Sequence, residues 1–419
     1  MTATTTAPET TGSGPSLLGV AGPTYFPIAF IARLPFAMMV VGVLTLVVAG
    51  RESLAFGGLS SAMVGIGAAC VGPLVGAAAD RFGQRRAVLA AGIVNSLALL
   101  LMTWVVFSPM PGWTVLASAA LVGASAPQVG PMSRSRLVGM ITTRLPARRR
   151  VRTLLSTMAY ESAADEVIFV FGPVIVGVLA TTMDVAAPMI GAAVLTAIFV
   201  TAFALHPSGR IEPGAASGAA VQAPARELLR PGVLVVVVGV FGMGLFFGST
   251  LTGLTAFMRD AGDAESAGLY YGVLGVGSAA LALGSALLPT RFTLAARWTC
   301  FAAVLVTGAV IVAIAPSLPW LVVGLAVAGI GVGPTLVTNF SLGADRSPAG
   351  RSATVMTIMG SALILGQSIA SAINGILADA VGTAAALGAP LVAAFVVLGA
   401  GITNAALARS SARRAATDS

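Results

Sequence analysis

Long apolar runs recur along the whole chain, and they constrain its fold more than any other feature of the sequence. A helix needs about 20 apolar residues to cross the ~30 Å hydrocarbon layer of a membrane. Hydrophobic residues make up 57% of the chain and charged residues only 9%, whereas a soluble domain carries roughly 25% charged residues. So few charges cannot cover a surface that faces water. The sequence therefore predicts a helical membrane protein and excludes a soluble enzyme.

The apolar runs predict twelve membrane-spanning helices, divided into two sets of six by a Pro-, Gly- and Ala-rich stretch. The predicted spans lie at 26–50, 54–79, 87–108, 113–133, 153–181, 185–205, 231–257, 267–289, 298–315, 318–343, 352–377 and 383–408. We expect a disordered cytoplasmic tail, a six-helix half, a cytoplasmic linker, a second six-helix half and a second cytoplasmic tail over 1–24, 25–206, 207–230, 231–408 and 409–419. The linker would let the two halves move against each other.

Arginines mark one side of the predicted membrane protein. The chain contains no lysine, and with the N-terminus inside the cell every arginine except Arg33, Arg51 and Arg259 falls in a tail or loop on the cytoplasmic side. Basic loops stay in the cytoplasm, so the pattern predicts a multi-pass protein with both termini inside. Its basic charge then reflects membrane orientation and not binding to nucleic acid. The alanine-rich, lysine-free composition is typical of a high-GC bacterium and favours the bacterial cytoplasmic (inner) membrane.

The loop predicted between the second and third spans carries the most specific motif in the sequence. It reads GAAADRFGQRR, with anchor residues Gly76, Asp80, Arg81, Gly83, Arg85 and Arg86. A glycine at position 83 permits a tight turn, and the three arginines hold the loop on the cytoplasmic side. With the twelve spans and the central break, this motif resembles the signature loop of the major facilitator superfamily.

The resemblance implies an all-α fold of two pseudo-symmetric six-helix halves and a secondary transporter. It also places the second span beside the eleventh, so that Asp80 would face the positive N-terminal end of the eleventh span near Arg351. We expect this contact to latch the halves together on the cytoplasmic side. The alternatives are that Asp80 merely caps a helix or pairs with Arg85.

The fifth predicted span contains three acids close together, Glu161, Asp165 and Glu166. Counted from Arg152 at ~1.5 Å per residue, Asp165 lies ~20 Å deep. A charge at the bilayer centre costs at least ~2.5 kcal/mol, so the acids must face a cavity, be paired or be protonated. Glu161 and Asp165 share a helix face, where two close carboxylates tend to hold one proton between them.

Arg33 in the first span is the expected counter-ion of these acids. We therefore predict that Asp165, Glu161, Glu166 and Arg33 couple transport to protons. Two alternatives remain open. Arg33 can snorkel to the headgroups, and Arg134 or Arg136 can form a static bridge with Glu161.

Two further sets of residues are candidates for hinge and substrate sites. The run FVFGPVIVG, with Gly172, Pro173 and Gly177, resembles part of the superfamily's antiporter motif and predicts a bendable point at the interface between the halves. The resemblance implies a cavity lined by spans one, four, seven and ten, and span eleven adds one further candidate. The full set is Gln128, Phe241, Phe246, Phe247, Thr338, Asn339 and Gln367. Aromatic side chains with few charges suit an amphiphilic or apolar substrate, although each can instead serve packing.

Our first functional hypothesis is proton-coupled export, by antiport, of a small amphiphilic or apolar molecule. Proton-coupled uptake of a small polar nutrient is the alternative, but spans seven to ten contain no internal charge to bind one. A non-transporting membrane sensor is the third hypothesis. No catalytic constellation appears, and a single histidine with two isolated cysteines predicts neither metal nor cofactor. We expect a monomer in the lipid bilayer whose partners are a substrate and protons.

The arginine pattern makes a prediction about membrane topology. Single cysteines placed in 207–230, in a variant without Cys70 and Cys300, should resist impermeant thiol reagents in intact cells because the linker lies inside. Ready labelling of these cysteines would overturn the orientation.

Overall fold

The computed structural model describes residues 16–417 except 53, 211–222, 263–266 and 290. The described residues fold into helices and their connections, without a strand. Eleven described segments are long and apolar enough to cross a membrane, and the long helix with the intramembrane acids is the twelfth. The predicted all-α fold with twelve spans in two six-helix halves is confirmed.

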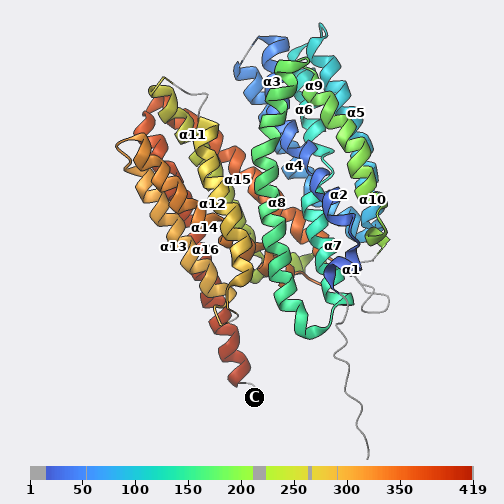
Figure 1. Ribbon diagram of the computed structural model, residues 1–419, viewed down its shortest axis with the longest axis vertical. Helices are drawn as coiled ribbons and strands as arrows, with labels where there is room; N and C mark the ends of the chain where they lie inside the picture. Colours follow the sequence, from blue (N-terminus) through green and yellow to red (C-terminus); the bar gives the residue numbers. More distant parts are fainter. Residues whose placement is uncertain (1–15, 53, 211–222, 263–266, 290, 418–419) are drawn as a thin grey trace, which may run out of the picture.

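Figure 1 shows the halves as two groups of long helices, coloured blue to green and yellow to red. The first half contains α1 (Leu17–Ala21), α2 (Tyr25–Ile31), α3 (Leu34–Arg51), α4 (Leu54–Phe82), α5 (Gln84–Phe107), α6 (Gly112–Ala124), α7 (Val129–Arg144), α8 (Ala147–Thr182), α9 (Ala187–Leu195), the π-helical η1 (Thr196–Val200) and α10 (Thr201–Leu205). The 3₁₀ turns η2 (Pro207–Arg210) and η3 (Ala225–Leu229) follow. The second half contains α11 (Pro231–Asp260), α12 (Ala267–Gly284), the 3₁₀ turn η5 (Ser285–Leu287), α13 (Leu294–Ala313), α14 (Leu318–Asp345), α15 (Ser352–Ala380) and α16 (Thr383–Thr417).

Two spans of the first half are interrupted. The first span breaks between α2 and α3 at Ala32 and Arg33, where the ring nitrogen of Pro35 has no hydrogen to donate back along the helix. The fourth span breaks between α6 and α7, after Pro127, where Gln128 takes a left-handed conformation with φ of 51°. Each break turns the backbone within a membrane span, which is tolerated where protein surrounds it.

The fourth span is longer than the sequence predicts. The expected end at residue 133 is wrong, because the apolar segment continues through α7 to Arg144. Arg134 and Arg136, which the sequence pattern assigned to a cytoplasmic loop, are therefore buried helical residues. Their guanidinium groups find partners inside the protein, so hydropathy overstates the cost of placing them there.

The expected chain ends also need correction. A disordered tail over 1–24 is wrong for its last part, because α1 forms there with the Ser16 hydroxyl as its N-cap. Its residues Leu17 and Val20 pack against buried apolar side chains of the first half, which stabilises so short a helix. At the other end α16 continues to Thr417, beyond the predicted span end at residue 408. Residues 211–222 of the predicted linker lie outside the description.

Small residues bring the two halves together along α4 and α15. A Cβ added to Gly65 would lie 2.7 Å from the Ser368 hydroxyl, and one added to Gly72 would lie 2.7 Å from the Ser361 hydroxyl. At Gly76 an added Cβ would be only 2.0 Å from the Thr357 hydroxyl. This close approach needs glycine on α4. These contacts run along α4 towards the end of the molecule where α4 ends and α15 begins. We call this end the arginine-rich end.

The close packing predicts the effect of a larger residue at position 76. Gly76→Val should cost about 1–3 kcal/mol of overpacking in this arrangement, and thus raise the population of molecules open at the arginine-rich end by about ten-fold. The measurement is the rate at which a maleimide labels Ala353→Cys, a buried position beside Gly76, in purified protein without Cys70 and Cys300.

Gly58→Val is the matched control on α4, because an added Cβ at Gly58 meets no atom within 4 Å. Equal labelling rates in the two variants would contradict the packing argument.

Candidate functional site

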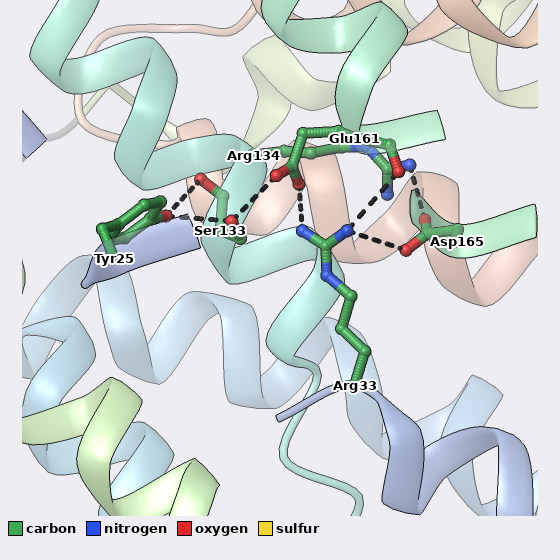
Figure 2. Close-up of polar contacts among 6 residues, drawn as sticks. All are labelled: Tyr25, Arg33, Ser133, Arg134, Glu161 and Asp165. Carbon is green, nitrogen blue, oxygen red and sulfur yellow. Dashed lines mark hydrogen bonds and ion pairs between the residues drawn. The ribbon is translucent and has the colours of Figure 1, made fainter. Parts of the chain in front are cut away.

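Four charged side chains form an ion-pair cluster inside the first half of the protein (Figure 2). Arg33 comes from the break between α2 and α3, Arg134 from α7, and Glu161 and Asp165 from successive turns of α8. The Nη2 of Arg33 pairs with the Glu161 carboxylate. Its Nη1 lies 3.2 Å from Asp165 Oδ1, and Arg134 Nη2 lies 2.6 Å from Asp165 Oδ2. Asp165 is thus held between two guanidinium groups.

The four side chains differ in burial. The side chain of Glu161 is 0% exposed, that of Arg33 5% and that of Arg134 4%, whereas Asp165 is 27% exposed. Buried charges are tolerated when they are paired and hydrogen-bonded. Each charge of this cluster is paired, while the Nε atoms of Arg33 and Arg134 have no hydrogen-bond partner. Asp165 is the member of the four that a molecule from outside the cluster can reach.

Two neutral side chains fix Glu161 from the other side. Ser133 Oγ donates a hydrogen bond to Glu161 Oε1 over 3.1 Å. Because that hydroxyl proton is committed, the Tyr25 hydroxyl donates to Ser133 Oγ over 2.9 Å. Sequence reasoning missed both residues. The polar run Ser-Arg-Ser-Arg at 133–136, in an otherwise apolar span, was the signal that could have found Ser133.

Arg134 also connects the cluster to the second half. Its guanidinium carbon lies 3.9 Å from the centroid of the Phe340 ring on α14. A cation over an aromatic face is attracted by the ring, more strongly where water is excluded. Arg134 therefore contacts Asp165 in one half and Phe340 in the other, a connection that the sequence did not predict.

The cluster opens into a cavity of about 80 Å³ between the halves. Its polar lining comes from Arg33, Gln128, Arg134 and Asp165. Apolar lining residues come from both halves, among them Phe36, Ile168, Phe169, Phe340, Leu363 and Ile364. Gln128 is only 6% exposed and its Nε2 has no hydrogen-bond partner. The cavity therefore has an apolar wall and, besides the paired Asp165 carboxylate, side-chain polar groups that are mainly hydrogen-bond donors.

The expected pairing of Arg33 with the acids of the fifth span is present. Arg33 is buried and does not snorkel. Arg134 pairs with Asp165 and not with Glu161, while Arg136 donates to Gln84 Oε1, the Phe203 carbonyl and the Ser208 hydroxyl. The side chain of Glu166 lies outside the description. The role of the acids in proton coupling stays a prediction.

Most of the predicted substrate residues do not line this cavity. Gln128 does, but Phe246 and Phe247 are packed in the hydrophobic core of the second half. Thr338 is buried and donates to the Pro334 carbonyl, and Asn339 is fully buried. Phe241 and Gln367 are half-buried outside the cavity lining. The aromatic cavity residue on α14 is the neighbour Phe340, because the helix turns that face towards the first half.

The helix is not bent at the bendable point predicted for Gly172, Pro173 and Gly177, and the hinge stays a prediction. The helix α8 runs without a break from Ala147 to Thr182. A Cβ added to Gly172 would lie 2.6 Å from Ala37 Cβ on α3, so this glycine allows close packing within one half. The side chain of Pro173 lies outside the description.

Asp80 makes the contact that the sequence resemblance implied. Its carboxylate accepts hydrogen bonds from the backbone N–H groups of Ala353, at 3.1 Å, and Thr354, at 2.7 Å, and from the Thr354 hydroxyl at 2.6 Å. These groups form the N-terminus of α15 in the opposite half, where a negative charge is stabilised. The adjacent turn uses Gly83 at φ of 89°. Arg81, Arg85 and Arg86 are exposed around it.

This contact predicts that Asp80 holds the arginine-rich end closed. Asp80→Asn removes the charge from three hydrogen bonds, each worth about 1.5–3 kcal/mol with a charged acceptor, and should widen that end while lowering turnover. Spin labels at the exposed positions Arg86 and Arg409, one in each half, measure the separation. Asp345→Asn, an exposed acid at the end of α14, is the control. An unchanged distance distribution together with wild-type transport would show that Asp80 has no part in closure.

Comparison with known proteins identifies the family. The family model of the Major Facilitator Superfamily matches residues 25–371. No curated protein sequence matches the chain.

Three solved structures illustrate the shared fold. The human organic anion transporter MFSD10 (TETRAN) is 16% identical, with 93% of this chain and 100% of that chain covered and a TM-score of 0.69. A bacterial homologue of the iron transporter ferroportin, in an outward-facing state, is 12% identical over 92% and 99%, with a TM-score of 0.74. The E. coli fucose:proton symporter FucP is 14% identical over 90% and 98%, with a TM-score of 0.62. At these identities the likeness concerns the fold alone.

Proposed function

Because the chain belongs to the Major Facilitator Superfamily, we propose that it is a proton-coupled secondary transporter that exports a small amphiphilic molecule by alternating access. The observation that carries this proposal is the position of Asp165. It is the partly exposed acid of a buried ion-pair cluster, and it lines a cavity between the two halves.

Proton coupling requires a group that changes its charge and meets the cavity. Arginines do not lose their proton in proteins, so in the described part of the cluster this role is left to the two carboxylates. Glu161 is enclosed by Arg33 and Ser133, whereas Asp165 is accessible. One proton moving down a 100 mV potential yields about 2.3 kcal/mol, which is enough to drive a substantial cargo gradient. A fucose:proton symporter among the structural neighbours shows that this fold supports proton coupling.

The cavity lining favours an amphiphilic cargo. Aromatic and aliphatic side chains such as Phe36, Phe169 and Leu363 offer an apolar surface. The charged lining residues Arg33, Arg134 and Asp165 are joined in one group by ion pairs. Uptake of a polar nutrient is the weaker candidate, because the cavity residues from the second half, including Phe340 and Ile364, are uncharged. A small molecule with one polar end and an apolar body fits the lining best.

Alternating access would use the interface between the halves. In this structure Asp80 accepts hydrogen bonds from the N-terminus of α15 at the arginine-rich end, which supports a closing role for it, and the cavity lies farther along the same interface. We propose that the arginine-rich end faces the cytoplasm of a bacterium, with both termini inside, and that Asp80 releases α15 when the cavity opens to that side. The protein would work as a monomer.

Neutralising the acids tests proton coupling. Asp165→Asn should abolish uphill transport driven by a pH gradient in proteoliposomes, because the accessible group can no longer change its charge. Glu161→Gln should shift the pH dependence instead, since it alters the charge beside Asp165 through Arg33. Cargo is first identified by screening a compound panel against the wild type.

Asp379→Asn is the matched control. Asp379 on α15 also pairs with an arginine, Arg259 at 3.0 Å, but this pair is exposed and does not line the cavity. Transport by this variant should equal that of the wild type. Proton-driven accumulation that survives when Glu161, Asp165 and Glu166 are all neutralised would return these acids to a structural role.

A further inference from the structure

From the donors around Asp165 we infer that the cavity binds an organic anion, whose acidic group takes the place of the Asp165 carboxylate between Arg33 and Arg134. This inference rests on the proposed function and deepens it by naming the class of cargo. It also changes the expected mode of coupling from exchange to cotransport.

The donor groups point to a ligand that accepts hydrogen bonds. Arg134 Nη2 and Arg33 Nη1 converge on the two oxygens of one carboxylate, at 2.6 and 3.2 Å. Guanidinium groups match carboxylates in geometry as well as in charge. Gln128 also lines the cavity, but its unpartnered Nε2 is buried towards Gly72 of α4, so the two arginines are the donors that the site offers. The two guanidinium groups therefore form a site for a carboxylate. In this structure the site is occupied by the carboxylate of Asp165, the exposed member of the cluster.

The net charge of the cluster explains how protonation of Asp165 would allow the anion to bind. Two guanidinium groups and two carboxylates balance, so the cavity has no net attraction for an anion while Asp165 is ionised. Protonation of Asp165 leaves one positive charge in excess, because Glu161 continues to neutralise Arg33. An anion that binds Arg134 then faces a neutral carboxylic acid and not a second negative charge. Proton and anion therefore bind together.

Charged and aromatic groups face Asp165 from several neighbouring elements. Arg33 faces it from the α2–α3 break, Arg134 from α7, and Glu161 from its own helix. Tyr160, also on α8, is close enough to interact electrostatically with Asp165. The second half contributes the uncharged Phe340, Gly360, Leu363 and Ile364 to the cavity. The side chain of Glu166 is outside the description, so the charge balance refers to the described groups.

The apolar lining supplies the rest of the site. Phe340 stacks on Arg134 and belongs to the opposite half, so an apolar body attached to the acidic group would contact both halves. Cargo and proton would cross in the same direction. One proton with one monovalent anion moves no net charge, so in this mode the membrane potential does not drive export. Export then occurs when the outward gradient of the anion exceeds the inward gradient of protons, as for an acidic product made inside the cell.

Three compounds of one shape test the choice of charge: benzoate, benzamide and benzylammonium. Their binding to the purified full chain is measured by calorimetry at pH values of about 6 and about 8. Benzoate should bind at least about ten-fold more tightly than the other two, and more tightly at the lower pH. Titrations in two buffers of different ionisation enthalpy should show proton uptake with benzoate. Preference for benzylammonium, equal binding of all three, or no binding of any would overturn the inference.

Two variants test the site itself. Asp165→Asn removes the built-in competitor, so it should bind benzoate at least as tightly as the wild type, without pH dependence and without proton uptake. Arg134→Gln should bind benzoate about ten-fold or more weakly, while Arg259→Gln at the exposed ion pair should bind as the wild type does. Weaker benzoate binding in Asp165→Asn would overturn the inference even if Arg134→Gln failed to fold.

The two proposals fail in different ways. If benzoate binds as expected but no proton-driven flux depends on Asp165, the proposed function is wrong and the anion site stands. If flux depends on Asp165 but the wild type prefers benzamide or benzylammonium, the anion site alone is wrong.

Discussion

Two arginines and two carboxylates lie among the membrane-spanning helices, and each charge is stable there because the others pair with it. Removing one partner from a buried pair costs about 3–5 kcal/mol, so the helices that carry them must meet at one place. The break at Ala32 and Arg33 turns the first arginine towards α8. The break after Pro127 starts α7 in a new direction that places Arg134 beside Asp165. Each of the two helix breaks thus places one arginine of the cluster.

The cluster has a fixed side and an accessible side. Glu161 is held by Arg33 and by Ser133, whose hydroxyl is in turn bonded to Tyr25, so its oxygens are committed to partners within one half. Asp165 faces the cavity, and its partner Arg134 stacks on a ring of the other half. A change in the charge of Asp165 therefore acts on a residue that contacts both halves. Glu161 and Asp165 lie one helical turn apart on the same helix. Their different partners make one acid fixed and the other accessible.

Hydropathy, the arginine pattern and one loop motif were sufficient to predict the architecture, because the membrane excludes most other folds. The pairing of Arg33 with the acids followed from the cost of an isolated charge. For Arg134 the sequence offered only a static bridge to Glu161 as an alternative. Its pairing with Asp165 and its contact with Phe340 were not predicted, since hydropathy treats a paired arginine as if it were alone. Phe246 was chosen as a cavity residue, but it lies in the core of the second half, because the face that a helix turns to its neighbour depends on packing that composition does not record.

The helix α15 joins the Asp80 contact to the cavity. Its N-terminal N–H groups at Ala353 and Thr354 hold Asp80, and farther along the same helix Gly360 and Leu363 line the cavity. Seven residues of helix span only ~10 Å, so the two sites cannot move independently while α15 stays straight. A ligand that fits the cavity better in one arrangement must then bias the Asp80 contact, and the Asp80 contact must alter the affinity of the cavity by the same factor. If Asp80 closes the arginine-rich end as proposed, this helix alone would couple closure to binding.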